Sequence, residues 1–175
     1  MDAMGTDEGH RRTKQPLSAA LAGPYGHPFH PMLVTVPIGA WVSSLVLDVG
    51  SHLVGDGAGL ADAARWLIAI GVIGALAAGA VGFLDFLTIP PHTGAHRTAV
   101  THLSVNLSVI VLFAVNWLWR IGDTGPTAAG QIVLSAVGLA ALGVSGWLGG
   151  RLAYHFGVRV ARESDQASGF TEKRS

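Results

Sequence analysis

The chain has 175 residues, the length of one domain of ordinary size; 50% of them are hydrophobic, 13% are charged and 24 are glycine. A soluble domain carries roughly 25% charged residues, so this composition indicates a membrane protein rather than a soluble or a disordered chain. Eleven basic residues balance eleven acidic ones, which gives no indication of nucleic-acid binding, and the lack of Cys excludes disulfides, cysteine-ligated iron–sulfur clusters and cysteine nucleophiles.

The chain begins with a polar segment, residues 1–26, which we expect to be a flexible tail. Four apolar stretches follow, and each is long enough to cross the hydrocarbon layer of a bilayer, which takes about 20 helical residues. They cover about residues 31–54, 66–89, 100–121 and 128–154. Backbone groups cannot stay unpaired in lipid, so these stretches are expected to be helices. A second polar segment, residues 161–175, is the expected C-terminal tail.

Turn-forming residues separate the four stretches. Gly-Asp-Gly-Ala-Gly occupies 55–59, Ile-Pro-Pro-His-Thr-Gly occupies 89–94, and Gly-Asp-Thr-Gly-Pro occupies 122–126. Such short connections make sequential helices antiparallel neighbours. The sequence therefore predicts an all-α polytopic membrane protein, an antiparallel four-helix transmembrane bundle over residues 27–160, with the lipid bilayer around it.

Small residues recur every four positions in the second and fourth stretches. Examples are Gly71, Ala75 and Gly79 in the second stretch, and Gly146 and Gly150 in the fourth. Ridges of this kind let membrane helices approach closely, and packing within the bundle explains nearly all of them. The same ridges could also support a homodimer.

Basic residues favour one side of the membrane. If the helices alternate in direction, nine of the eleven Lys and Arg residues fall on the side of the chain termini: Arg11, Arg12, Lys14, Arg97, Arg151, Arg159, Arg162, Lys173 and Arg174. The other side holds only Arg65 and Arg120. The positive-inside rule then places both termini in the cytoplasm.

Six of the eight histidines fall at this same cytoplasmic end of the predicted bundle, although their sequence positions are scattered. They are His27, His30, His92, His96, His102 and His155. His10 lies in the first tail, and His52 alone lies at the opposite face. The sequence indicates no particular role for His92 and His155.

Two of these histidines lie on inward stripes of their helices. The third span carries His102, Asn106, Phe113 and Asn116 at helical spacing, and the first span carries His30, Pro37, Trp41, Ser44 and Asp48. Polar residues inside a span face the bundle or a cavity. We therefore expect His30 and His102 to face inward at similar depth.

Two carboxyl groups also lie within the spans, where they are costly unless paired. Asp48 lies toward the outer end of the first span, on the side that holds Arg65 and Arg120, so an interhelical ion pair is expected there. Asp85 lies near the histidines and could accept the second N–H of an imidazole.

The run His-Pro-Phe-His-Pro-Met-Leu-Val-Thr-Val-Pro-Ile-Gly at 27–39 resembles the opening of a bacterial family known as domain-of-unknown-function family 2231. The resemblance continues to about residue 160 through Asp48, Gly82, Asp85, His102, Asn106, Gly146, Gly149, Gly150 and Tyr154 to Gly157. It implies a four-helix protein of the bacterial inner membrane. Some relatives carry a Rieske-type iron–sulfur domain after the bundle, which implies electron transfer. These 175 residues contain no such domain and no Cys.

Paired imidazoles on facing helices suit the ligation of a b-type haem. We expect His30 and His102 to bind one haem iron from both sides, which favours electron transfer over oxygen chemistry. Arg97 could pair with a propionate, and the glycines of the second and fourth spans could admit the flat ring. Three neighbours are expected to form hydrogen bonds around the ligands: Asn106, Asp85 and Tyr154.

Two alternatives to haem remain open. A bare transition-metal site for Zn, Cu or Fe would draw its ligands from His30, His102, His96 and His27. A cofactor-free structural or assembly subunit would use the same polar cluster only to pack its helices. The chain offers no soluble substrate pocket, so we expect no stand-alone enzyme activity, and we expect a redox partner or a larger membrane complex.

The predicted orientation can be tested by labelling engineered cysteines, since the chain has none of its own. Cysteines placed in 55–62 or 122–126 should react with an impermeant thiol reagent from outside intact cells. A cysteine placed in 89–94 should react only after the membrane is opened. The reverse pattern would contradict cytoplasmic termini.

Overall fold

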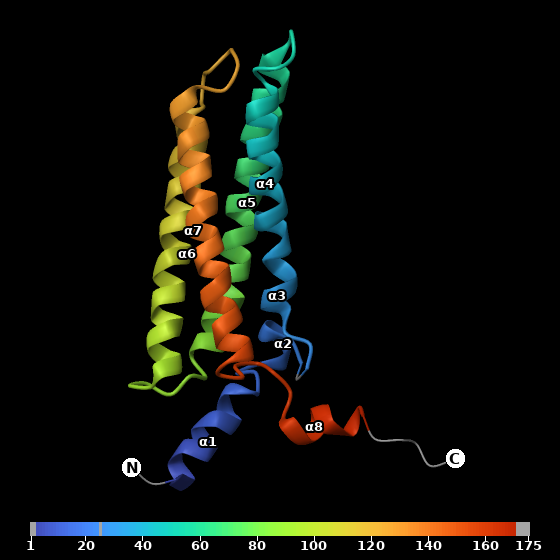
Figure 1. Cartoon of the computed structure of the whole chain (residues 1–175), viewed down its shortest axis with the longest axis vertical. Coiled ribbons are helices and arrows are strands. Elements are labelled where there is room, and N and C mark those ends of the chain that lie inside the picture. Colours follow the sequence, from blue (N-terminus) through green and yellow to red (C-terminus); the bar gives the residue numbers. More distant parts are fainter. Residues whose placement is uncertain (1–2, 25, 171–175) are drawn as a thin grey trace, which may run out of the picture.

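The computed structural model describes residues 3–24 and 26–170, and this part of the chain is helical without strands. Four helical spans are long and apolar enough to cross a membrane: Phe29–Gly50, Gly57–Phe86, Gly94–Trp119 and Ala129–Tyr154. The first span consists of α3 (Phe29–Leu33) and α4 (Thr35–Gly50), and the others are α5, α6 and α7 (Figure 1). The predicted fold class is confirmed.

The helices differ from the predicted spans mainly at their first turns. Helix α5 begins at Gly57 and α6 at Gly94, several residues before the apolar stretches of 66–89 and 100–121. The polar first turn of α6 stays helical because Thr93 caps it by accepting the amide of His96 at 3.1 Å, whereas Asp56 makes no such side-chain bond at the start of α5. The first span ends at Gly50, four residues earlier than expected.

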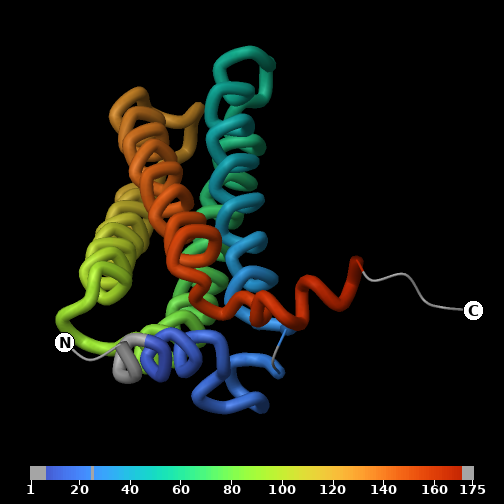
Figure 2. Tube along the Cα trace, turned by 60° about the horizontal axis from the view of Figure 1, so that its bottom comes forward, coloured from blue at the N-terminus to red at the C-terminus, as the bar shows by residue number. Residues whose placement is uncertain are grey.

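The spans form two antiparallel hairpins, α4 with α5 and α6 with α7, which lie side by side (Figures 1 and 2). The loops 51–56 and 120–128 lie together at one end, here called the far end. The loop 87–93 and both chain termini lie at the other, the terminal end (Figure 1).

The hairpins meet around an aromatic stack in the middle of the bundle. The rings of Trp41 and Phe113 are parallel within 6°, with centroids 4.1 Å apart. The indole N–H of Trp41 donates to the carbonyl of Ile68 at 3.2 Å, so its polar atom is satisfied inside the bundle. Side chains on the outer faces are mostly apolar and exposed, and they imply a lipid bilayer around the helices.

A buried ion pair joins the hairpins at the far end. The guanidinium of Arg120 donates to both carboxylate oxygens of Asp48, and the Nη2–Oδ2 distance is 2.9 Å. Asn116, Thr127 and Ser135 complete the hydrogen bonds of the pair. This is the interhelical pair expected for Asp48, and its partner is Arg120. Arg65 pairs instead with Asp62 of its own helix at 2.6 Å.

The N-terminal segment packs more closely than the expected flexible tail. It forms α1 (Ala3–Thr13) and α2 (Ala19–Ala22), and Lys14 and Ala22 are buried. The guanidinium Nη2 of Arg159 donates to the carbonyls of Ala22 and Gly23 at 2.9 and 3.1 Å, and the Arg159 amide donates to the carbonyl of Thr13 at 2.9 Å. These bonds fasten the segment across the terminal end, because they give hydrogen-bond acceptors to a buried guanidinium.

The C-terminal segment, expected as a flexible tail over 161–175, contains the short exposed helix α8 (Glu163–Ser168). Lys14 donates to Glu163 Oε1 at 2.9 Å, and this hydrogen bond lowers the pKa of that carboxyl below its ordinary value. The remaining positions of the two tails, residues 1–2, 25 and 171–175, lie outside the described residues.

Removing one partner of the buried ion pair should destabilise the bundle strongly. We expect Asp48→Ala to lower the free energy of unfolding by about 3–5 kcal/mol, because it leaves the Arg120 charge buried without its carboxylate. Asp62→Ala, which breaks a largely exposed pair, is the control and should cost about 1 kcal/mol or less. Unfolding by denaturing detergent in mixed micelles measures both. Equal effects of the two variants would contradict a structural role for the buried pair.

Candidate imidazole site

His30 lies on α3 at the terminal end and faces α5. Its Nδ1 lies 2.8 Å from the carbonyl oxygen of Ala78. A carbonyl can only accept, so Nδ1 carries the proton and donates. The ring fills the space left by Gly82: a Cβ at that position would lie 2.8 Å from ring atoms of His30.

His102 on α6 faces α7 in the same way. Its Nδ1 donates to the carbonyl of Ser145 at 2.9 Å, and the hydroxyl of Ser145 lies 3.1 Å from the same nitrogen. A Cβ at Gly149 would lie 3.2 Å from Cε1 of the ring. The Nε2 atom lies 3.0 Å from the amide nitrogen of Asn106, one helical turn further along α6. This is the contact between Asn106 and an imidazole that the sequence suggested.

The two hairpins repeat one pattern of positions. Four inward positions of the first span recur 72 residues later in α6 and at its C-cap: His30 and His102, Trp41 and Phe113, Ser44 and Asn116, Asp48 and Arg120. Three positions of the second helix recur 67 residues later in α7: Gly71 and Gly138, Ala78 and Ser145, Gly82 and Gly149. Equivalent residues also make equivalent contacts, because each aromatic ring and each imidazole packs on the matching glycine.

Members of the repeated pairs meet between the hairpins. Trp41 stacks on Phe113, and Asp48 pairs with Arg120. The two hairpins are thus related approximately by a two-fold axis along the bundle, and both imidazoles lie at its terminal end. No local sequence motif indicates this repeat, which becomes visible only when residues at fixed offsets are compared.

Asp85 lies beside the site, but its closest charged partner is a guanidinium. Its Oδ1 is 2.9 Å from Nε of Arg159, at an angle that does not make a hydrogen bond, so the contact is an ion pair only. The structure therefore gives Asp85 a cation as its direct partner, where the sequence suggested an imidazole N–H.

The other predicted site residues lie apart from the pair. His96 packs on the ring of Phe86, with centroids 5.2 Å apart, and Tyr154 is 92% exposed. Arg97 is exposed, and the backbone amide of His27 donates to the carbonyl of Pro24 at 3.0 Å. Within residues 3–24 and 26–170, no three His, Cys, Asp or Glu side chains are grouped so that they could hold a metal ion.

Of the two histidines without an assigned role, His92 adopts a positive φ of 64° in the loop, and His155 packs edge-on against Phe156. At the far end, Nε2 of His52 lies 2.8 Å from the carbonyl oxygen of Thr127. Each of these three histidines therefore has a local structural setting away from the imidazole pair.

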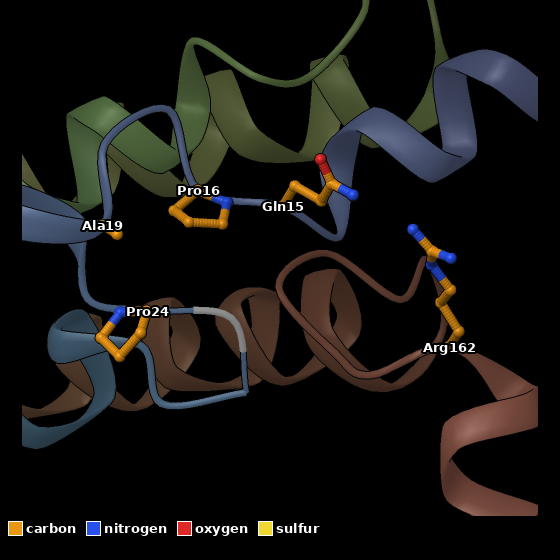
Figure 3. A pocket seen from close by; sticks show the side chains of 5 residues that line it. All are labelled: Gln15, Pro16, Ala19, Pro24 and Arg162. Carbon is orange, nitrogen blue, oxygen red and sulfur yellow. The ribbon is translucent and has the colours of Figure 1, made fainter.

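An open surface pocket of about 460 Å³ lies between the two terminal segments (Figure 3). Its lining consists of Gln15, Pro16, Ala19, Pro24 and Arg162. None of these is among the predicted ligands. The pocket therefore belongs to the packing of the terminal segments and not to the imidazole pair.

Comparison with protein families gives one match. The profile described as "Predicted membrane protein (DUF2231)" matches residues 26–162, which include all four spans and both imidazoles. No curated protein and no solved structure matches the chain.

The packing of His30 on Gly82 can be tested with a glycine that lies in open space. Gly82→Ala should lower the stability of the bundle by about 1–3 kcal/mol, because its Cβ would overlap a hydrogen-bonded ring. Gly79→Ala, on the same helix, meets nothing within 4 Å and should be neutral or stabilising by up to about 1 kcal/mol. Detergent unfolding of both variants is the measurement. The close packing would be refuted by a Gly82 variant as stable as the Gly79 variant.

Proposed function

The chain belongs to the DUF2231 family of predicted membrane proteins, and we propose that it is a haem-binding electron-transfer module or membrane subunit. In this proposal His30 and His102 ligate one b-type haem near the cytoplasmic face of a bacterial inner membrane. The single observation that carries it is the matched state of the two imidazoles at equivalent positions of the repeat.

Both rings hold the tautomer that a metal ligand needs. Each Nδ1 donates to a helix carbonyl, at 2.8 Å for His30 and 2.9 Å for His102, so each lone pair lies on Nε2. Hydrogen bonds of this kind fix ring orientation and raise the basicity of the ligating nitrogen. Two imidazoles whose Nδ1 atoms are bonded alike on the two halves of the bundle offer the donor set of a bis-His haem.

Two features of the surroundings differ from the haem site expected from the sequence. The inward glycines Gly82 and Gly149 are occupied by the imidazoles themselves, so they accommodate the ligands rather than the flat ring. The lone pair of His102 accepts from Asn106, and this hydrogen bond would have to open. Arg97 is exposed at the terminal end and remains the proposed propionate partner.

A bis-imidazole haem supplies one-electron transfer and leaves no axial position open for oxygen. The residues between the imidazole pair and the far end favour electron transfer over transport of a substrate. The Trp41–Phe113 stack and the Asp48–Arg120 pair fill the space between the hairpins. A substrate path along this axis would have to break both, so the site is better suited to exchanging electrons with a partner at the cytoplasmic side.

A second candidate function is a cofactor-free structural or assembly subunit. The hydrogen bond from Asn106 favours it, because this bond already satisfies the imidazole nitrogen that would bind iron. In that case the polar pair would specify how the helices pack, and other subunits of a membrane complex would supply the activity.

An absorption spectrum of the protein, expressed with adequate haem supply and purified in mild detergent, decides between the two. We expect a Soret band and sharpened bands after dithionite reduction, as for bis-imidazole haem. Both should be lost in His30→Ala and in His102→Ala. His52→Ala should keep them, because His52 lies at the far end. A colourless wild-type protein would overturn the haem proposal and favour the cofactor-free subunit.

A further inference from the structure

The repeat allows the two imidazoles to be compared position by position. Asn106 follows His102 by one helical turn, and the position that corresponds to it after His30 is Val34. Both lie on continuous helical backbone, since the amide of Val34 donates to the carbonyl of His30 at 3.1 Å. The two halves therefore differ in one side chain at the place where each Nε2 lone pair can be reached.

The hydrogen-bond pattern around His102 fixes the direction of each bond. Nδ1 is bonded to a carbonyl oxygen of Ser145, so it must donate. Nε2 of the neutral ring can then only accept, and the partner at 3.0 Å is the amide nitrogen of Asn106, which donates. The lone pair that would bind a metal is thus occupied by an N–H from within the protein.

His30 differs at this atom. Its Nδ1 is bonded to the carbonyl of Ala78, as in the other half. Val34 has no polar side-chain atom, and no hydrogen bond to Nε2 of His30 is made by the described residues. Among the described residues, the Nε2 lone pair of His30 therefore accepts no hydrogen bond, whereas the Nε2 lone pair of His102 accepts one from Asn106.

We infer that Asn106 is a latch on His102, and that it makes the two half-sites inequivalent. A ligand that accepts an imidazole lone pair binds Nε2 of His30 first, and it engages His102 only after the Asn106 amide has left. This inference rests on the proposed haem function for the identity of the ligand. Asn106 acts through His102 and is a positioning residue.

The latch also explains the polar residue at position 106. An asparagine that served only helix packing would need a partner on a neighbouring helix, whereas the side-chain contact observed for Asn106 is with His102 on its own helix. Before iron binds, the Asn106 amide holds the His102 ring in the tautomer and orientation that it needs as the second iron ligand. Opening the latch costs one neutral hydrogen bond, which is small enough to be reversible.

Two variants exchange the residues of the two halves. Asn106→Val gives the second half the residue of the first, and Val34→Asn gives the first half the residue of the second. In titrations of the full-length apoprotein with haemin in detergent, we expect Asn106→Val to lower the dissociation constant by about twofold to tenfold, the range for one net hydrogen bond. Val34→Asn should raise it by a similar factor.

A second measurement needs no haem. In ¹⁵N-histidine-labelled apoprotein, the Nε2 resonance of His102 should shift in Asn106→Val toward that of a nitrogen without a hydrogen bond, while His52 stays unchanged. An unchanged His102 resonance would overturn the latch, regardless of the result of the haemin titrations.

The outcomes separate the two proposals. If wild-type protein binds haemin and Asn106→Val binds it no more tightly, the latch is wrong and the haem function stands. If neither the wild type nor either variant binds haemin, the haem function and the order of ligation both fail. The histidine resonances then still decide whether Asn106 holds His102.

Discussion

The hydrocarbon layer offers no water to a polar group, so every buried N–H, carboxylate and imidazole in this bundle has to find its partner inside the protein. Three interhelical contacts meet that requirement. Arg120 and Asp48 neutralise each other at the far end, and each imidazole donates to a carbonyl of the neighbouring helix. These contacts fix which helices are neighbours and how far each helix is shifted along the bundle axis relative to the next. Apolar packing alone could not fix them, since lipid is as apolar as the helix surfaces.

Close helix approach makes these contacts possible, and the glycines provide it. Trp41 packs where Gly71 has no side chain, and Phe113 does the same at Gly138. The carbonyls of α5 and α7 come within reach of an imidazole for the same reason at Gly82 and Gly149. Four glycines thus admit rings between paired helices, Gly71 and Gly82 in α5 and Gly138 and Gly149 in α7, while a Cβ at Gly79, Gly146 or Gly150 would meet nothing within 4 Å.

Much of the fold could be predicted from hydropathy and from the cost of burying charge. Four long apolar stretches indicated the spans, and a lone carboxylate at Asp48 required a basic partner, which proved to be Arg120. The helix start at Gly94 could not be read in the same way, because the first turn of α6 is stabilised by the Thr93 cap and not by lipid. The start at Gly57 has no side-chain cap that would have indicated it.

Parts of the site could not be predicted because they depend on segments far apart in the sequence. The partner of Asp85 is Arg159, which follows the last span and also binds the backbone of the N-terminal segment. Nothing in the local pattern around either residue indicates that meeting. The internal repeat was hidden for a different reason. Its halves share histidines and glycines, but other equivalent positions carry different residue types, since a tryptophan corresponds to a phenylalanine and an aspartate to an arginine.

The divergence between the halves has a physical logic. On a two-fold axis an unchanged repeat would place like residues opposite each other, and two facing aspartates in lipid would repel without compensation. Aspartate in one half and arginine in the other turn that position into the strongest link of the bundle. At the terminal end, the difference between the halves leaves a polar atom unpaired within the described part of the chain instead of creating a pair. Val34 and Asn106 leave one imidazole lone pair open and the other occupied, and this end also holds a guanidinium atom of Arg159 without a hydrogen-bond partner among the described residues. Polar groups are thus fully paired where the bundle must be rigid, and incompletely paired at the end where a ligand or partner can reach them.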